Sequence, residues 1–188
     1  MSKMISSSEI KKDMTYIFEN KYYKCIELTY ISGSFFSRRK SHVKVVAKRI
    51  NDDAIVEMIL YPNDSVKQID LSESKMTFVY DDGVSLCFMN PDTCDTIEVS
   101  NTKFEWEKNF LTADLEVSCL VCENEIIKIN LPDEVCLTLI SCDEINRSKP
   151  VKNAVCETGL KVQVPLFTNV NDRICVSTLD GTYTGRAR

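Results

Sequence analysis

KNAVCETGLKVQVPLFTNVNDRICVSTLDGTYTGRAR, residues 152–188, is the stretch that decides the fold. Pro165 lies near the end of its first apolar run, a position that favours an edge strand, and Asp180-Gly181 predicts a tight hairpin turn. A period of two residues indicates β-strands, and this part of the chain is therefore predicted to be a small β-domain. Three runs alternate apolar and polar residues: LKVQVPLF (160–167), DRICVST (172–178) and TYTGRA (182–187).

The same period continues through the rest of the chain, and turn signals such as Asn51-Asp52-Asp53 and Asp81-Asp82-Gly83 separate the runs. Short strands at intervals of about 8–12 residues are typical of all-β barrels and sandwiches. Only FEWEKNFL (104–111) predicts a short helix. The other strand-like runs are 15–18, 23–31, 42–48, 54–60, 76–80, 84–89, 115–121, 125–131 and 135–140.

Two breaks divide the chain, a polar run at 62–74 and the segment Leu131-Pro132-Asp133-Glu134. Each of the three pieces has about 60 residues, a size at which a domain buries little apolar area and depends on its neighbour. We therefore predict three small β-barrels in a row.

The bulk composition is that of a globular protein, with 44% hydrophobic and 27% charged residues in 188. No apolar run is long enough to span a membrane. The first residues, MSKMISSSEIKKDM, lack the apolar core of a signal peptide. We expect a cytoplasmic protein that does not contact a membrane.

Nine cysteines, an odd number, are expected to be reduced thiols in the cytosol, mostly buried in cores. Cys119 and Cys122 form a CxxC, but residues three apart on a strand point to opposite faces. A structural zinc site needs four nitrogen or sulfur ligands, and neither a second CxxC nor a nearby histidine is present. We therefore predict no metal and no cofactor.

The segment SGSFFSRRKSHVKVVAKR, residues 32–49, carries six of the chain's 23 basic residues, its only histidine, and no acid. The chain as a whole has a formal charge of −5. Positive charge concentrated on an acidic body predicts a polyanion site, with a solvated hairpin of ordinary lysines as the alternative. Phe35 and Phe36 could stack on bases or pack on their own barrel. The predicted RNA-binding residues are Arg38, Arg39, Lys40, Lys44, Lys48 and Arg49.

The C-terminal stretch resembles the third domain of the bacterial elongation factor P family. The matching residues there are Lys152, Ala154, Gly159, Val162, Val164, Pro165, Asp180-Gly181-Thr182-Tyr183 and Arg186-Ala187. Weaker matches follow in the family's order along the chain, at 9–14, 20–23, 80–83 and 88–89. The resemblance therefore extends over almost the whole chain.

This resemblance implies an elongated, L-shaped, tRNA-mimicking protein. Its domains would be an SH3-like or KOW-like N-terminal domain with a basic tip loop (1–68), a central OB domain (69–131) and a C-terminal OB domain (132–188). Family members bind the ribosome between the P and E sites and position the P-site tRNA when peptide bonds form slowly, above all at consecutive prolines. They act by orientation rather than as enzymes. The implied partners are rRNA, P-site tRNA and an enzyme that modifies the tip, and a monomer is expected.

The tip departs from the family, whose members read Pro-Gly-Lys-Gly or Ser-Gly-Arg there. Counting back from the strand HVKVVAKR places Arg38 at the modified position, whereas counting forward from YKCIELTYI places Phe35 there. The loop is thus predicted to be longer by three residues. We choose Arg38 and keep Arg39 and Lys40 as alternatives. A longer tip that reaches its target without a modification is a hypothesis that follows from the same count.

Two further departures concern turns. The family's Gly-Asp-Thr loop, which is thought to approach the E-site codon, is replaced by residues 143–149. Asp13 and Asn171 stand where the family has glycine, and Asp and Asn best tolerate left-handed backbone angles. We therefore expect both of these turns to survive.

Two alternatives to the translation factor stay open: a paralogue of the family with another ribosomal role, and a general RNA-binding module that reuses the fold. An enzyme is the weakest hypothesis, because the chain has one histidine, no nucleophile motif and no phosphate-binding loop. His42 is predicted to be a strand residue at the base of the tip rather than a general base.

Overall fold

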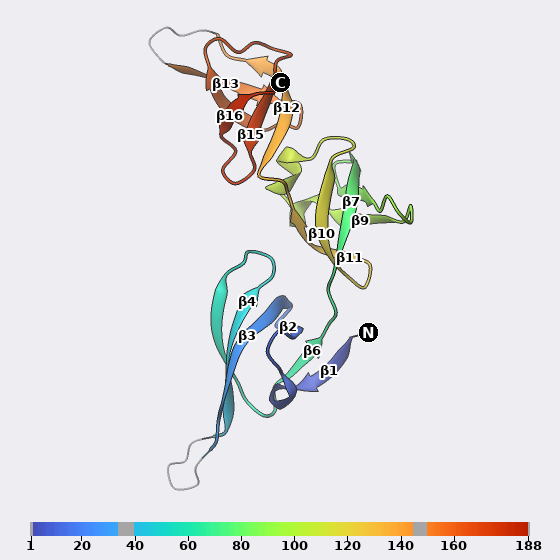
Figure 1. Cartoon of the computed structure of the whole chain (residues 1–188), viewed down its shortest axis with the longest axis vertical. Coiled ribbons are helices and arrows are strands. Elements are labelled where there is room, and N and C mark those ends of the chain that lie inside the picture. The colour runs from blue at the N-terminus through green and yellow to red at the C-terminus, as the bar shows by residue number, and fades with distance from the viewer. Residues whose placement is uncertain (1, 34–39, 145–149, 188) are drawn as a thin grey trace. The chain divides into compact units, whose positions relative to one another are not determined.

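The protein is described by a computed structural model covering residues 2–33, 40–144 and 150–187. Over these residues it is all-β, and its strands form three curled antiparallel sheets (Figure 1). The predicted fold class is thereby confirmed. Contacts define two compact units, one of residues 1–73 with 120–128 and the other of residues 74–119 with 129–188. The division at 68/69 and 131/132 into three domains stays a prediction.

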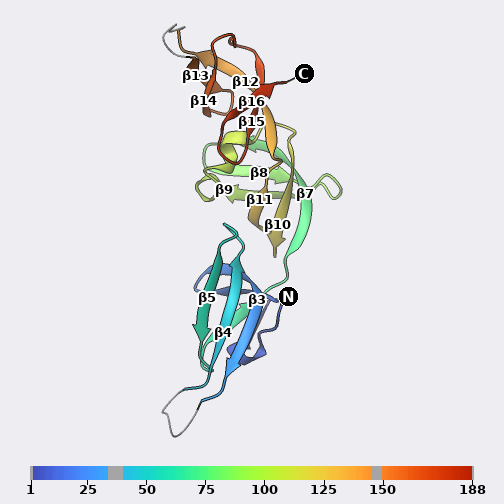
Figure 2. The same cartoon turned by 60° about the vertical axis from the view of Figure 1, so that its left-hand side comes forward.

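The first unit contains a six-stranded sheet in the order β1-β6-β2-β3-β4-β5. The long strands β3 and β4 lie side by side, and β5 forms one edge (Figure 2). Polar strand residues face outward while Val43, Val45 and Ala47 of β4 are buried, as the period of two predicts. The strands are β1 Lys3–Ser6, β2 Thr15–Phe18, β3 Lys21–Ile31, β4 His42–Arg49, β5 Ile55–Leu60 and β6 Ser65–Gln68.

Local turn chemistry holds this sheet in register. Glu19 and Asn20, between β2 and β3, both have positive φ, which is the signature of the type I′ turns that suit the twist of a hairpin. Asp13 has φ 64 and donates its backbone N–H to the Cys25 carbonyl at 2.9 Å. In the other unit Asn171 has φ 69, so both predicted left-handed positions are confirmed.

Residues 120–128 join the first unit through an apolar cluster. Its buried members are Ile50, Ile69, Cys122 and Ile127. Cys119, three residues before Cys122, is fully buried and lies in the other unit. Burial raises the pKa of the Cys119 thiol to about 12. The two buried thiols of the CxxC therefore belong to different units of the chain.

The second unit holds two five-stranded sheets, ordered β11-β10-β7-β8-β9 and β14-β13-β12-β15-β16. β14 is an edge strand that ends at Pro165, as predicted. The strands are β7 Ser72–Asp81, β8 Ser85–Met89, β9 Thr96–Ser100, β10 Glu116–Cys122, β11 Glu125–Asn130, β12 Glu134–Cys142, β13 Val151–Cys156, β14 Lys161–Pro165, β15 Arg173–Ser177 and β16 Tyr183–Arg186. The start of β7 and the hairpin formed by β10 and β11 belong to the first unit.

The predicted helix at 104–111 is a short 3-10 turn, η3 Glu107–Phe110. Phe110 is fully buried in the core of the C-terminal sheet. The ring centroids of Trp106 and Phe110 are 5.2 Å apart, and the Trp106 indole N–H donates to the Thr178 carbonyl at 2.9 Å. Because these aromatic side chains serve tertiary contacts, one tight turn is sufficient. Two other short 3-10 turns are η1 Ser7–Glu9 and η2 Asn101–Lys103.

Candidate functional site: the β3–β4 hairpin

The β3–β4 hairpin carries the basic segment, and its last strand pair is Ile31 with His42. Just beyond that pair, the backbone N–H of Gly33 donates to the Ser41 hydroxyl at 3.0 Å. Arg38, Arg39, Phe35 and Phe36 lie outside the described residues. The predicted working residue at the tip therefore stays a prediction, whereas the base from which it projects can be described.

His42 lies at this base, as predicted. Its Nδ1 is 3.1 Å from the Lys40 carbonyl, and its ring centroid is 6.1 Å from that of Tyr61. Lys40, Ser41 and Tyr61 also line a shallow pocket of about 470 Å³. An exposed aromatic ring beside basic groups suits contact with an RNA backbone or base. Tyr61 was missed because it follows a strand run and precedes a proline, a place that predicts only a turn.

Lys44 is exposed on β4, two residues after His42. Its Nζ is 2.8 Å from Glu57 Oε2 on the neighbouring strand β5. Both side chains are about half exposed, so the pair contributes little to stability, roughly 0–1 kcal/mol. Lys44 can therefore exchange this carboxylate for a phosphate at small cost.

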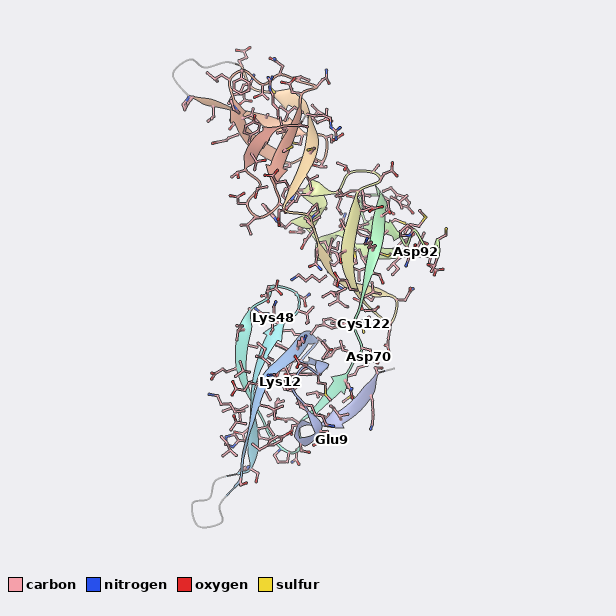
Figure 3. The ribbon with its side chains drawn as sticks, in the orientation of Figure 1. Glu9, Lys12, Lys48, Asp70, Asp92 and Cys122 are labelled. Carbon is pink, nitrogen blue, oxygen red and sulfur yellow. The ribbon has the colours of Figure 1, made fainter. Side chains whose placement is uncertain are left out.

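Lys48 lies at the other end of β4, beside the β4–β5 turn (Figure 3), and Arg49 is the last residue of the strand. Lys48 is six positions after His42, which is roughly 20 Å along a strand. Lys48 pairs with Asp53 at 2.8 Å, and Arg49 binds Asp52 with two nitrogens, Nε at 2.7 Å. The four described basic residues, Lys40, Lys44, Lys48 and Arg49, are therefore spread along the hairpin and do not form one patch.

These ion pairs neutralise positive charge at the Arg49 end of β4, which we call the far end. The pKa of the Asp53 carboxyl is lowered by hydrogen bonds from Lys128 and then from Lys48. Hydrogen bonding to Arg49 lowers the pKa of Asp52. The acids that pair with these basic residues follow them directly in the sequence, at 52, 53 and 57. These ion pairs could have been predicted from the sequence, because strands were predicted at 42–48 and 54–60 with a turn between them.

Among the described residues no acid pairs with Lys40. Of the described basic residues in segment 32–49, Lys40, which lies nearest the tip, is therefore the one without an acidic partner. No cluster of three or more metal-ligating side chains occurs in the described part of the chain. In the same residues, no helix has the length and apolarity to cross a membrane.

Over its described residues the molecule is thus an all-β protein whose long β3–β4 hairpin carries basic side chains at its surface. Family models agree with this class: "Elongation factor P (EF-P) OB domain" matches residues 71–129, and "Elongation factor P, C-terminal" matches residues 142–186.

Relatives cover the full chain. The chain is 32% identical over 188 residues to "Elongation factor P" of Mesoplasma florum, covering 98% of this chain and all of that protein. It is 34% identical to the protein of the same name from Mesomycoplasma hyopneumoniae strain 232, with the same coverage. The chain belongs to the elongation factor P family, whose members are translation elongation factors and not enzymes.

A solved structure of "Eukaryotic translation initiation factor 5A from Methanococcus jannaschii" has a TM-score of 0.42 and 14% identity to the chain. The match covers 68% of this chain and 94% of that one. This similarity is too low to argue from.

Proposed function

We infer that this protein binds the ribosome between the P and E sites and speeds peptide-bond formation at consecutive prolines by positioning the P-site tRNA. The observation that carries this is family membership over the full chain, combined with the hairpin that holds the basic tip. Orientation of a reactant can remove a large part of a reaction barrier without chemistry by the protein.

The described geometry supports a tip that acts by reach and charge. β3 and β4 are paired from Tyr23 with Arg49 to Ile31 with His42, so the base of the tip is a stiff support. Arg38 is the proposed working residue, with Arg39 and Lys40 as alternatives. The proposed partners are rRNA and P-site tRNA, joined by a modifying enzyme if the tip is modified, and the protein acts as a cytoplasmic monomer. Intact-mass analysis of protein from its native host tests the modification.

A reconstituted translation system without its own elongation factor P tests the proposal. Two templates of equal length are compared, one encoding consecutive prolines and one encoding none. The protein is expected to raise the yield of the proline template alone. No increase on that template, or an equal increase on both, would contradict the proposal.

A paralogue with another ribosomal role is a second candidate, favoured by the absence of the family's Pro-Gly-Lys-Gly and Ser-Gly-Arg tips. Ribosome binding without rescue at prolines would favour it. A general RNA-binding module would bind free RNA as well as it binds ribosomes, with an affinity that falls steeply as the salt concentration rises.

A further inference from the structure

Two cysteines face each other across the centre of the C-terminal sheet. Cys136 on β12 and Cys175 on β15 are direct partners in an antiparallel pair. Their Sγ atoms are 2.7 Å apart and share a hydrogen bond. Direct cross-strand partners lie at about 4.5–5.5 Å between Cα atoms, inside the range of about 4.4–6.8 Å that a disulfide requires. The sulfurs need to approach by only about 0.6–0.7 Å to bond.

Solvent can reach this pair. Both thiols are half-buried, while their strand neighbours Val135, Leu137 and Ile174 are buried in the core. The strand period therefore turns the thiols to the outer face of the sheet. Beside Cys175 on β16 stands Gly185, where an added Cβ would meet nothing within 4 Å. A glycine there leaves the sulfurs open on that side.

The mutual hydrogen bond, burial and nearby charges all affect the pKa of this pair, and through it the reactivity. The pKa of Cys175 is raised to about 11, first by the hydrogen bond with Cys136 and then by burial. Glu134 on β12 also raises this pKa, and Arg173 on β15 lowers it. Because the thiolate is the reactive form, oxidation is expected to be slow at neutral pH and to accelerate as pH rises.

We propose that Cys136 and Cys175 form an oxidisable dithiol, a modification site at which hydroperoxides or small disulfides introduce a reversible cross-strand disulfide. With hydrogen peroxide, one thiolate attacks an oxygen, the O–O bond breaks, and a sulfenic acid and hydroxide form. The second thiol then attacks the sulfenic sulfur, and water leaves. Two thiols thus lose two electrons and peroxide becomes two waters. Excess thiol reverses the bond by exchange.

The disulfide would join β12 to β15 at the centre of the sheet and close a long loop of chain. Closing such a loop restricts the unfolded state more than the folded one. The C-terminal sheet should therefore unfold at a temperature higher by roughly 5–10 °C once oxidised. This inference does not depend on the proposed ribosomal function.

The test uses the full chain with Cys94→Ser as background, since Cys94 is an exposed thiol that would react on its own. The protein is treated with hydrogen peroxide or oxidised glutathione, the remaining thiols are alkylated, and peptides are mapped by mass spectrometry without reduction. We expect a linked pair of peptides containing Cys136 and Cys175, lost after dithiothreitol, and forming faster at pH 9 than at pH 7. The temperature shift should disappear in C94S/C136S and C94S/C175S.

Three results would overturn the proposal. One is that Cys136 and Cys175 are both still alkylated, and so still reduced, after the other accessible cysteines have been fully oxidised. Another is sulfinic acid at either position with no linked peptide. The third is a disulfide that joins two copies of the chain. Peptide mapping of the background protein decides among these outcomes even if a serine variant fails to fold.

Discussion

The two ends of β4 carry the same kind of side chain in different surroundings. At the His42 end, Lys40 has no acidic partner among the described residues. At the Arg49 end, Lys48 and Arg49 are bound to Asp53 and Asp52. Basic residues of the same segment therefore differ in their contacts. One end has positive charge without an acidic partner among the described residues, and the other has its positive charge in ion pairs within the fold.

The largest expected effect comes from removing charge at the tip. Arg38→Ala should lower the yield from the proline template about tenfold or more, because the loss of one positioning contact can misplace a reactant. Lys48→Ala is the matched control, since it removes one positive charge from the ion-paired end and should change the yield less than twofold. Peptide yield in the reconstituted system measures both variants, with unfolding temperature as the check on folding.

Equal losses in the two variants would remove the distinction between the ends. Equal rescue by Arg38→Ala and the wild type would instead exclude Arg38 as the working residue while leaving the family assignment intact. Arg39→Ala and Lys40→Ala would then be the next variants to test.

The next largest expected effect is a loss of local stability when the apolar cluster beside the Arg49 end of β4 is weakened. Ile127 is fully buried against Ile50 and Ile69, so Ile127→Ala should lower local stability by about 2–4 kcal/mol through lost burial and a cavity. Ile59→Ala, at a side chain 54% exposed on β5, should change it by less than about 0.5 kcal/mol. Hydrogen exchange of the β2 and β3 amides measures both variants. Unchanged protection in Ile127→Ala would show that the cluster does not anchor this end.

Much of the fold could be predicted from the sequence wherever buried and exposed residues alternate along a strand. In β4 the buried Val43, Val45 and Ala47 alternate with the outward Lys44, so the strand and its faces follow from the pattern. β6 escaped prediction because its residues, SVKQ, include one apolar side chain, Val66, and no alternation can be detected. Partner strands supply the hydrogen bonds of β6, and those partners are distant in sequence.

The candidate site was predictable in composition but not in geometry. The number of basic residues can be read from the sequence, yet which of the described ones pair with acids depends on the β4–β5 register, which places Lys44 opposite Ile59 and Lys48 opposite Ile55. Diagonal neighbours and turn residues then decide the ion pairs. Residue types predict that such pairs can form, whereas side-chain positions decide which ones do.

The smallest expected effect tests the ion pairs directly. Asp53 accepts hydrogen bonds from Lys48 and Lys128, and both lower the pKa of its carboxyl. Asp53→Asn should lower stability by only about 0.5–1 kcal/mol, because the carboxyl is half exposed and water screens the charges. An acid whose folded pKa is depressed stabilises the fold above its unfolded pKa, about 3.9 for Asp. The difference between wild type and variant should therefore be constant above about pH 5 and shrink as pH falls through the folded pKa.

Hydrogen exchange of the β4 amides, compared between wild type and variant at several pH values from 7 down to 2, measures this difference, and NMR titration of Asp53 in the wild type gives its folded pKa. Ser65→Ala, at an exposed position of β6 in the same unit, serves as the control and should show no dependence on pH in this range. A difference between wild type and Asp53→Asn that persists unchanged at pH 2 would mean that the carboxylate charge is not what ties Lys48 to the turn. The far end of β4 would then be held by the apolar cluster alone, and the basic side chains at its two ends would differ less than their contacts indicate.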